Sequence, residues 1–121
     1  MLKPMALRCL IADDNPAFLE AASYLLERQG LEVVGVAASA GEAVERVAEL
    51  EPDVALLDIS LGEDDGFDVA HRLAGTRVIL ISAYAGEDYE DLIAASPAVG
   101  FVPKSQLSRR AIADLLADGR A

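Results

Sequence analysis

Five polar residues of the sequence carry groups that phosphoryl-transfer chemistry uses. Three are carboxylates, one is a hydroxyl and one is an ammonium: Asp13, Asp14, Asp58, Ser82 and Lys104. Three carboxylates brought close together repel one another, and this repulsion raises at least one of their pKa values unless a cation enters. A small set of hard oxygen ligands suits Mg²⁺, which keeps several of its waters.

This combination points to the transfer of a phosphoryl group to an aspartate. A divalent ion neutralises charge on the phosphoryl group and aligns it for in-line attack by a carboxylate. An ammonium opposite the ion neutralises the remaining phosphoryl oxygens, and a hydroxyl can bind one of them. Taken singly, the same residues have plainer roles, because adjacent aspartates often cap a helix and an isolated polar loop residue is usually solvated. Only their assembly at one place favours a site.

Each of the five residues ends or follows an apolar run, which is typical of strands in a parallel sheet. Runs this short and this apolar indicate strands that are covered on both faces. The expected strands are residues 6–12, 31–37, 54–59, 77–83 and 99–102. Because ligands bind at the carboxyl ends of such strands, that edge of the sheet is where the polar residues are expected to meet.

Segments of helical period separate these strands. Asn15 is expected to cap the first helix with Pro16 at its first position, Gly30 to close it, and Ser108 to precede the last helix. Alternating strands and helices with right-handed crossovers predict an α/β fold, a flavodoxin-like three-layer sandwich around a parallel five-stranded sheet in the order 2-1-3-4-5. The predicted inward faces consist of Phe18, Leu19, Ala22, Leu25 and Leu26; Val44, Val47 and Ala48; Val69, Ala70 and Leu73; Tyr89, Leu92 and Ile93; and Ala111, Ile112, Leu115 and Leu116.

Composition narrows the class of protein. The 121 residues suffice for one domain, taken as residues 1–121, and 53% of them are hydrophobic. The net charge of −11 disfavours direct binding to nucleic acid or to a membrane surface and favours proteins and cations as partners. Neither a membrane span nor a secretory signal is expected, because no apolar run approaches ~20 residues. The lone Cys9 agrees with a cytoplasmic location and is expected to lie in the core.

In order and spacing, these residues resemble the receiver domain of bacterial response regulators over essentially the whole chain. The ordered set of matches is specific, although each match alone is weak. Three positions depart from the family pattern. Gly62 stands where the family usually has proline, which predicts a looser loop. Ser105 follows Lys104 where many members have proline, and Phe101 lacks the hydroxyl of the common tyrosine. The matching features are the acidic pair Asp13 and Asp14, Asp58 followed eight positions later by Gly66, Ser82, and the segment Gly100–Lys104 with the aromatic Phe101.

The resemblance implies a role for each residue of the set. Asp58 would accept a phosphoryl group from a sensor histidine kinase or a histidine phosphotransfer protein, and Lys104 would bind a phosphoryl oxygen. The domain would be a phosphorylation-switched interaction module for a downstream protein or output domain, and not an enzyme in its own right. The implied ligands of Mg²⁺ are Asp13, Asp14, Asp58 and the backbone carbonyl of Ser60.

The resemblance also implies a switch. Ser82 would move toward the phosphoryl group, and Phe101 would change rotamer to fill the space that is vacated. The altered surface would comprise the fourth helix, the fifth strand and the fifth helix. Opposite charges on that surface allow a homodimer about a two-fold axis, because each subunit offers both halves. These charges are Glu87, Asp88, Glu90 and Asp91 on one helix and Arg109 and Arg110 on the other.

Two other functions compete with this interpretation. A small Mg²⁺-dependent phosphatase of the haloacid-dehalogenase type requires a second aspartate two positions after its nucleophile. The residues two positions beyond Asp13 and Asp14 are Asn15 and Pro16, which disfavours that class. A receiver-like module that signals without phosphate is hard to reconcile with a complete acidic set and Lys104.

Overall fold

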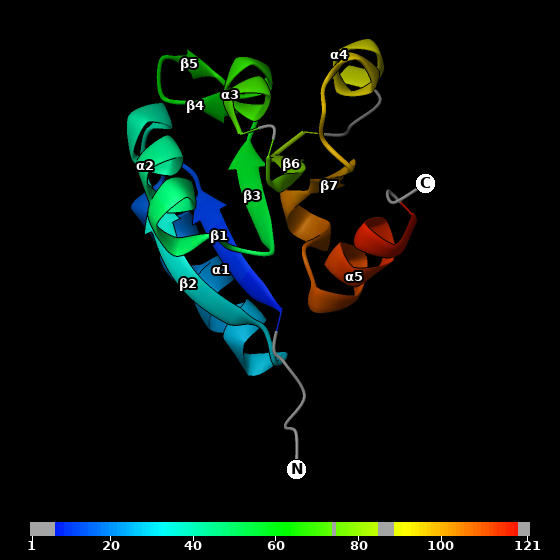
Figure 1. The fold of residues 1–121 in the computed structure, drawn as a ribbon. Helices are drawn as coiled ribbons and strands as arrows, with labels where there is room; N and C mark the ends of the chain where they lie inside the picture. Colours follow the sequence, from blue (N-terminus) through cyan, green and yellow to red (C-terminus); the bar gives the residue numbers. More distant parts are fainter. Residues whose placement is uncertain (1–6, 74, 85–88, 119–121) are drawn as a thin grey trace.

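The computed structural model describes residues 7–73, 75–84 and 89–118, which are organised around a five-stranded parallel sheet with helices on both faces (Figure 1). The sheet order is β2-β1-β3-β6-β7, which is the predicted flavodoxin-like order. The observed bounds differ from the predicted ones by at most two residues at either end. The strands are β1 (Arg8–Ala12), β2 (Glu32–Ala37), β3 (Val54–Asp58), β6 (Arg77–Ser82) and β7 (Gly100–Pro103).

The connecting helices follow the predicted alternation, and the sequence pattern missed two short elements. These are a hairpin of β4 (Ser60–Leu61) and β5 (Asp64–Asp65), and the 3₁₀ helix η2 (Lys104–Gln106). Within the described ranges, no helix has the length and apolarity needed to cross a membrane. Glu87 and Asp88, which were expected to begin the fourth helix, lie outside the described residues. The helices are α1 (Pro16–Arg28), α2 (Ala40–Leu50), α3 (Gly66–Arg72), α4 (Glu90–Ala95) and α5 (Arg109–Asp118).

The sheet carries a hydrophobic core on each face. Leu10 and Ala12 of β1 pack in the cluster that includes α2 and α3, whereas Cys9 and Ile11 pack in the cluster that includes α1 and α5. The central strands are apolar throughout because both of their faces are covered. Cys9 is fully buried, and this burial raises the pKa of its thiol to about 12, so the predicted role as a core residue is confirmed.

Local chemistry fixes both ends of α1 as predicted. The side chain of Asn15 accepts hydrogen bonds from the backbone N–H groups of Ala17 and Phe18 at 3.0 and 3.4 Å, and Pro16 occupies the first helical turn. Gly30 follows the helix with φ of 98°, a backbone conformation that residues other than glycine rarely adopt. The cap sets where the helix begins, immediately after the acidic pair.

Three residues that were predicted to face inward are exposed instead: Leu25, Ala48 and Leu92. Leu25 is 39% exposed, while its neighbour Leu26 is fully buried. Successive helical residues point about 100° apart, so the inner stripe of α1 has room for only one of these two side chains. Leu92 is 52% exposed, and none of the six residues of the short helix α4 is fully buried.

Gly66, the first residue of α3, packs tightly against the end of β3. A Cβ atom there would collide with the carbonyl oxygen of Asp58 and with the backbone of Ile59. We predict that Gly66→Ala lowers the free energy of unfolding by about 2–3 kcal/mol, because backbone atoms must move to make room. Urea unfolding would measure this loss.

The matched control is Gly41→Ala in α2, where a Cβ atom meets no described atom within 4 Å. This substitution should raise the free energy of unfolding by about 0.5 kcal/mol, because alanine favours a helix more than glycine does. Equal effects of the two substitutions would contradict the close packing at Gly66.

Candidate functional site

The polar residues singled out in the sequence lie at the ends of four consecutive strands of the sheet. Asp58 ends β3 and Ser82 ends β6, while Asp13 and Lys104 directly follow β1 and β7. Because β1, β3, β6 and β7 are neighbours and run parallel, these residues share one edge of the sheet (Figure 1). All three of Asp13, Asp58 and Ser82 are buried, with 0, 6 and 2% exposure.

Backbone N–H groups hold one oxygen of each buried carboxylate. The Oδ1 atom of Asp13 accepts a hydrogen bond from the N–H of Asn15 at 2.9 Å. The Oδ1 atom of Asp58 accepts one from the N–H of Ser60 at 3.0 Å. In both residues the Oδ2 atom is thereby directed to a different partner.

Asp14 is exposed and is held by the hairpin that follows β3. Its Oδ2 atom accepts a hydrogen bond from the backbone N–H of Gly62 at 3.1 Å. Gly62 lies at the turn of this hairpin with φ of 65°, a value that glycine adopts readily. The segment forms a two-stranded hairpin tied to the acidic pair, and the looser loop expected from Gly62 stays a prediction.

The three carboxylates present oxygen atoms to a common point. One oxygen each from Asp13, Asp14 and Asp58 lies within 4.8 Å of the other two. The Oδ2 atom of Asp13 is buried, and its partner among the described residues is the ammonium of Lys104. This ammonium is shared with Asp58, so the three carboxylates keep an excess of negative charge that a further cation would offset. This all-oxygen set, open to water on the side of the exposed Asp14, fits Mg²⁺.

The side chain of Lys104, which follows β7, approaches the same cluster of carboxylates. Its Nζ atom lies 2.5 Å from Oδ2 of Asp13, outside hydrogen-bonding angles, and donates to Oδ2 of Asp58 at 3.1 Å. The ammonium also lies 4.4 Å from the ring centroid of Phe18. Two buried carboxylates therefore share one ammonium, which neutralises only part of their charge.

Burial and charge shift the pKa values of Asp58 and Lys104. Burial is the largest cause that raises the pKa of Asp58, and the hydrogen bonds from Ser60 and Lys104 offset it only in part. Burial alone would lower the pKa of Lys104, but its contacts with Asp13 and Asp58 reverse that effect and raise it. Lys104 therefore stays charged, and an ionised Asp58 is unfavourable until more positive charge arrives.

Ser82 and Phe101 lie on adjacent strands near this site. The Oγ atom of Ser82 accepts a hydrogen bond from the backbone N–H of Tyr84 at 3.0 Å, so the hydroxyl is engaged in the turn that follows β6. Phe101 on β7 is half-buried and packs in the same cluster as Tyr89 and Ile93. The aromatic residue is thus placed between the sheet and the segment that carries α4.

Sequence reasoning missed two partners of the site, Phe18 and the N–H of Gly62. The helix cap at Asn15 was recognised, and Phe18 lies three positions after it, in the first turn of α1. That position could have indicated closeness to the acidic pair, but the spacing does not predict a contact with Lys104, which is 86 residues away in the chain.

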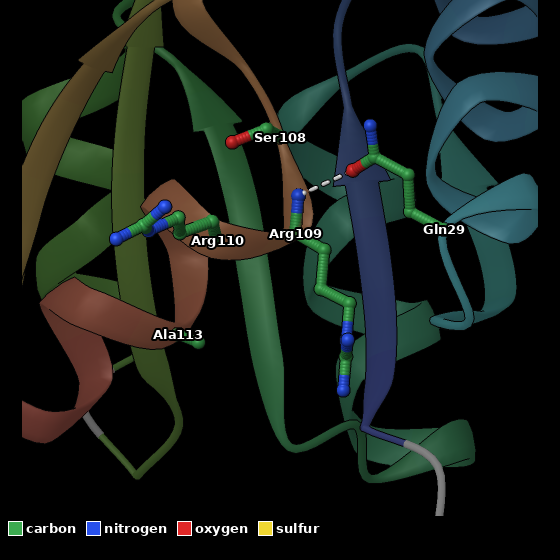
Figure 2. Close-up of a pocket in the computed structure, with 5 residues that line it drawn as sticks. All are labelled: Gln29, Ser108, Arg109, Arg110 and Ala113. Atoms are coloured by element: carbon green, nitrogen blue, oxygen red, sulfur yellow. Dashed lines mark hydrogen bonds between the residues drawn. The ribbon is translucent and has the colours of Figure 1, made fainter.

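A separate pocket of about 570 Å³ lies between the end of α1 and the start of α5 (Figure 2). The Oε1 atom of Gln29 accepts a hydrogen bond there from the backbone N–H of Arg109 at 2.6 Å. Figure 2 shows the side chains of Arg109 and Arg110 pointing in different directions. The predicted site residues, all within the described ranges, do not line this pocket, whose walls are Gln29, Ser108, Arg109, Arg110 and Ala113.

Comparison with known sequences identifies a family. The family model of the response regulator receiver domain matches residues 9–116. Protein-glutamate methylesterase/protein-glutamine glutaminase 5 of Myxococcus xanthus is 40% identical over 94 residues, which cover 74% of this chain and 27% of that protein. The chain spans half or less of the length of the curated relatives that it matches.

Solved structures share the fold over nearly the whole chain. A LuxR-family two-component response regulator from Aurantimonas sp. SI85-9A1 has a TM-score of 0.83 at 27% identity, with 93% of this chain and 86% of that chain covered. The response regulator domain of Thermotoga maritima CheB has a TM-score of 0.76 at 28% identity, with 96 and 95% covered. These matches support the signalling domain and not the phosphatase alternative. Because the family model covers most of its length, the chain belongs to the receiver domains of two-component response regulators.

Proposed function

We propose that this receiver domain works as a phosphorylation switch in which Asp58 accepts the phosphoryl group. The observation that carries the proposal is the setting of the Asp58 carboxylate at the end of β3. It is buried, its Oδ2 atom is 3.1 Å from Nζ of Lys104, and it shares the acidic cluster with Asp13 and Asp14. A carboxylate placed in this way has a fixed cation beside it to neutralise an incoming phosphoryl group.

The donor would be a phosphohistidine of a sensor histidine kinase or of a histidine phosphotransfer protein. An oxygen of Asp58 attacks the phosphorus atom, the P–N bond breaks, and its electron pair stays on the imidazole nitrogen of the donor. The N–H of Ser60, at 3.0 Å from Oδ1, orients the carboxylate for this attack. Lys104 stays protonated and neutralises the phosphoryl oxygens as they approach.

Mg²⁺ is the cofactor that the acidic cluster suits. Asp13, Asp14 and Asp58 would hold the ion together with the backbone carbonyl of Ser60. When bound, the ion would offset the negative charge shared by the carboxylates and the phosphoryl group. The N–H of Asn15 orients the buried carboxylate of Asp13, and the N–H of Gly62 orients the exposed Asp14.

Ser82 and Phe101 would relay the phosphorylated state to the surface. Ser82 would donate its hydroxyl hydrogen to a phosphoryl oxygen, and because its Oγ atom also accepts from the N–H of Tyr84 at 3.0 Å, its movement would pull on that residue. The turn after β6 would then rearrange, and Phe101 would repack beside Tyr89 and Ile93. Such a change needs two discrete packings, of which phosphorylation favours one.

The partners follow from this role. We propose that this domain acts in the cytoplasm, with a sensor histidine kinase or a histidine phosphotransfer protein upstream and a downstream protein or output domain as the regulated element. The relatives differ in their activities, since they include a methylesterase and a transcriptional regulatory protein, so the output is not implied by the receiver itself. A homodimer would pair Glu90 and Asp91 of α4 with Arg109 and Arg110 of α5.

The first prediction tests the phosphoacceptor. Incubation with acetyl phosphate and Mg²⁺ should add one phosphoryl group to the protein, whereas Asp58→Asn should add none because it lacks the nucleophile. Intact-mass spectrometry would measure both. The control is Asp64→Asn, an exposed residue of β5, which should be labelled like the parent protein. Labelling of Asp58→Asn at the parent rate would refute the assignment.

The second prediction concerns the metal. Asp14→Asn should weaken Mg²⁺ binding by about tenfold or more, because one of few hard oxygen ligands is lost. Isothermal titration would measure the dissociation constant, and Asp64→Asn again serves as a control that keeps the cluster intact. The site would be misplaced if both variants bound Mg²⁺ like the parent protein.

The third prediction concerns pH and stability without metal. Since burial raises the pKa of Asp58 above its ordinary value, ionised Asp58 destabilises the fold at pH 7. Asp58→Asn should therefore raise Tm by about 4 °C for each 1 kcal/mol of relief. The advantage should shrink as pH falls through the raised pKa and vanish below the ordinary pKa, because the carboxyl group becomes neutral first in the folded state and then in the unfolded state.

Thermal unfolding in EDTA at a series of pH values between neutral and about pH 4 would follow this difference. Asp64→Asn serves as the control, because this exposed residue of β5 lies outside the acidic cluster. A gain for Asp58→Asn that grew on acidification would have the wrong sign and would contradict the raised pKa.

The fourth prediction tests the relay. Beryllofluoride mimics the phosphoryl group, and with Mg²⁺ it should shift the amide resonances of Phe101 and of α4. Ser82→Ala should still bind the mimic. The amide shift of Phe101 should then be less than half of that in the parent protein, because the variant has no hydroxyl that can move toward the mimic. Shifts confined to residues beside Asp58 in the parent protein would show that this surface does not change.

A further inference from the structure

Phe18 brings an aromatic face to the phosphoryl-transfer site. It lies in the first turn of α1, is half-buried and packs in the cluster beneath α1 and α5. Its ring centroid is 4.4 Å from Nζ of Lys104, well inside the range of about 6 Å for a cation–π contact. The cap at Asn15 accepts a hydrogen bond from the N–H of Phe18 at 3.4 Å, so the backbone of the aromatic residue is held at the start of the helix.

The ammonium of Lys104 therefore has two kinds of partner. The carboxylates of Asp13 and Asp58 attract it as opposite charges, at 2.5 and 3.1 Å. The ring of Phe18 attracts it through its quadrupole, which carries no net charge and binds no proton. Only 20% of the Lys104 side chain is exposed, so these contacts act where water screens them little.

The two kinds of partner respond differently to the chemistry of the site. A divalent cation among the carboxylates competes for the oxygens that hold Lys104 and repels its ammonium. The aromatic ring offers no hard oxygen ligand, so a hard cation such as Mg²⁺ does not displace it from the ammonium. The hold of Phe18 on Lys104 is thus the contact that persists when the charge of the carboxylates is neutralised.

We propose that Phe18 is a positioning residue that keeps the ammonium of Lys104 at the phosphoryl site while a divalent cation occupies the acidic cluster. The inference rests on the proposed function, which gives Lys104 its role at the phosphoryl site. The contact between Phe18 and Lys104 does not depend on that function. Phe18 does not touch the phosphoryl group; it acts through Lys104. A chain with an aliphatic residue at this position would depend on the carboxylates alone to place the ammonium.

The matched variants are Phe18→Leu and Phe18→Tyr. Leucine keeps an apolar side chain in the cluster but has no π face, whereas tyrosine keeps the ring and should rescue the parent behaviour. A trifluorinated phenylalanine at position 18 provides a further variant that keeps the shape of the ring while it weakens the quadrupole. This variant preserves the test if Phe18→Leu folds poorly.

A spectroscopic measurement reports the contact without any reaction. The ring should shift the ε-methylene protons of Lys104 upfield, and this shift should survive a titration with Mg²⁺. Phe18→Leu should lose the shift, and Phe18→Tyr should keep it. An upfield shift that disappears when Mg²⁺ saturates the parent protein would overturn the proposal.

A kinetic measurement tests what the contact does. At saturating Mg²⁺, Phe18→Leu should slow phosphorylation by acetyl phosphate by about threefold to tenfold, the range that a partly desolvated cation–π contact supports. Phe18→Tyr should remain near the parent rate, and the trifluorinated ring should give an intermediate rate. In a Lys104→Met background, Phe18→Leu should have no further effect, because its action passes through the ammonium.

The outcomes separate this inference from the proposed function. If Asp58→Asn is labelled like the parent protein, the proposed function fails, whatever Phe18 does. If Asp58 is the acceptor but Phe18→Leu phosphorylates at the parent rate, only the role of Phe18 fails. An equal slowing by Phe18→Leu with and without Lys104 would indicate a structural role and would also overturn the proposal.

Discussion

Two buried carboxylates, those of Asp13 and Asp58, face a single ammonium at the carboxyl edge of the sheet. The charges do not balance, since a third carboxylate, that of Asp14, stands within the same cluster. Burial makes this imbalance costly, which is why the pKa of Asp58 is raised despite the nearby Lys104. Under the proposed function, a divalent cation would supply the missing positive charge before a phosphoryl group is transferred. The rest of the structure serves to hold this arrangement.

The sheet holds the arrangement by its order. Because β1 lies between β2 and β3, and β6 lies between β3 and β7, four strand ends that are far apart in sequence become neighbours. The apolar strands hold these ends in place, because both faces of the central strands are covered by other side chains. Loops then refine the placement, with the N–H groups of Asn15, Ser60 and Gly62 each directed at one carboxylate. Rigid strands and short donor-bearing loops together fix atoms that no single element could place.

The described elements differ in how firmly they are packed, and the difference matches the proposed division between chemistry and signalling. β3 is buried at every residue, so Asp58, the proposed phosphoacceptor, lies on a fully buried strand. α4 buries none of its residues, and Leu92 is exposed on it. Elements with little buried surface change conformation at low cost in free energy. Phe101 is half-buried and packs against the same core cluster as Tyr89 and Ile93, which suits the proposed role of a side chain that reports on the site.

The sequence by itself determined the strands, both ends of α1 and the identity of the polar residues, because apolar periodicity and capping are local properties. Asn15, Pro16 and Gly30 act on neighbours in the chain, so their roles could be inferred from type and position. Only the tertiary structure decided that Leu25 turns outward, that Gly62 donates to Asp14 and that Phe18 lies beneath Lys104. These features depend on which distant segment fills the adjoining space, and packing of that kind has no period in the sequence. The strand ends marked where the charges gather, and the fold alone set which atoms meet there.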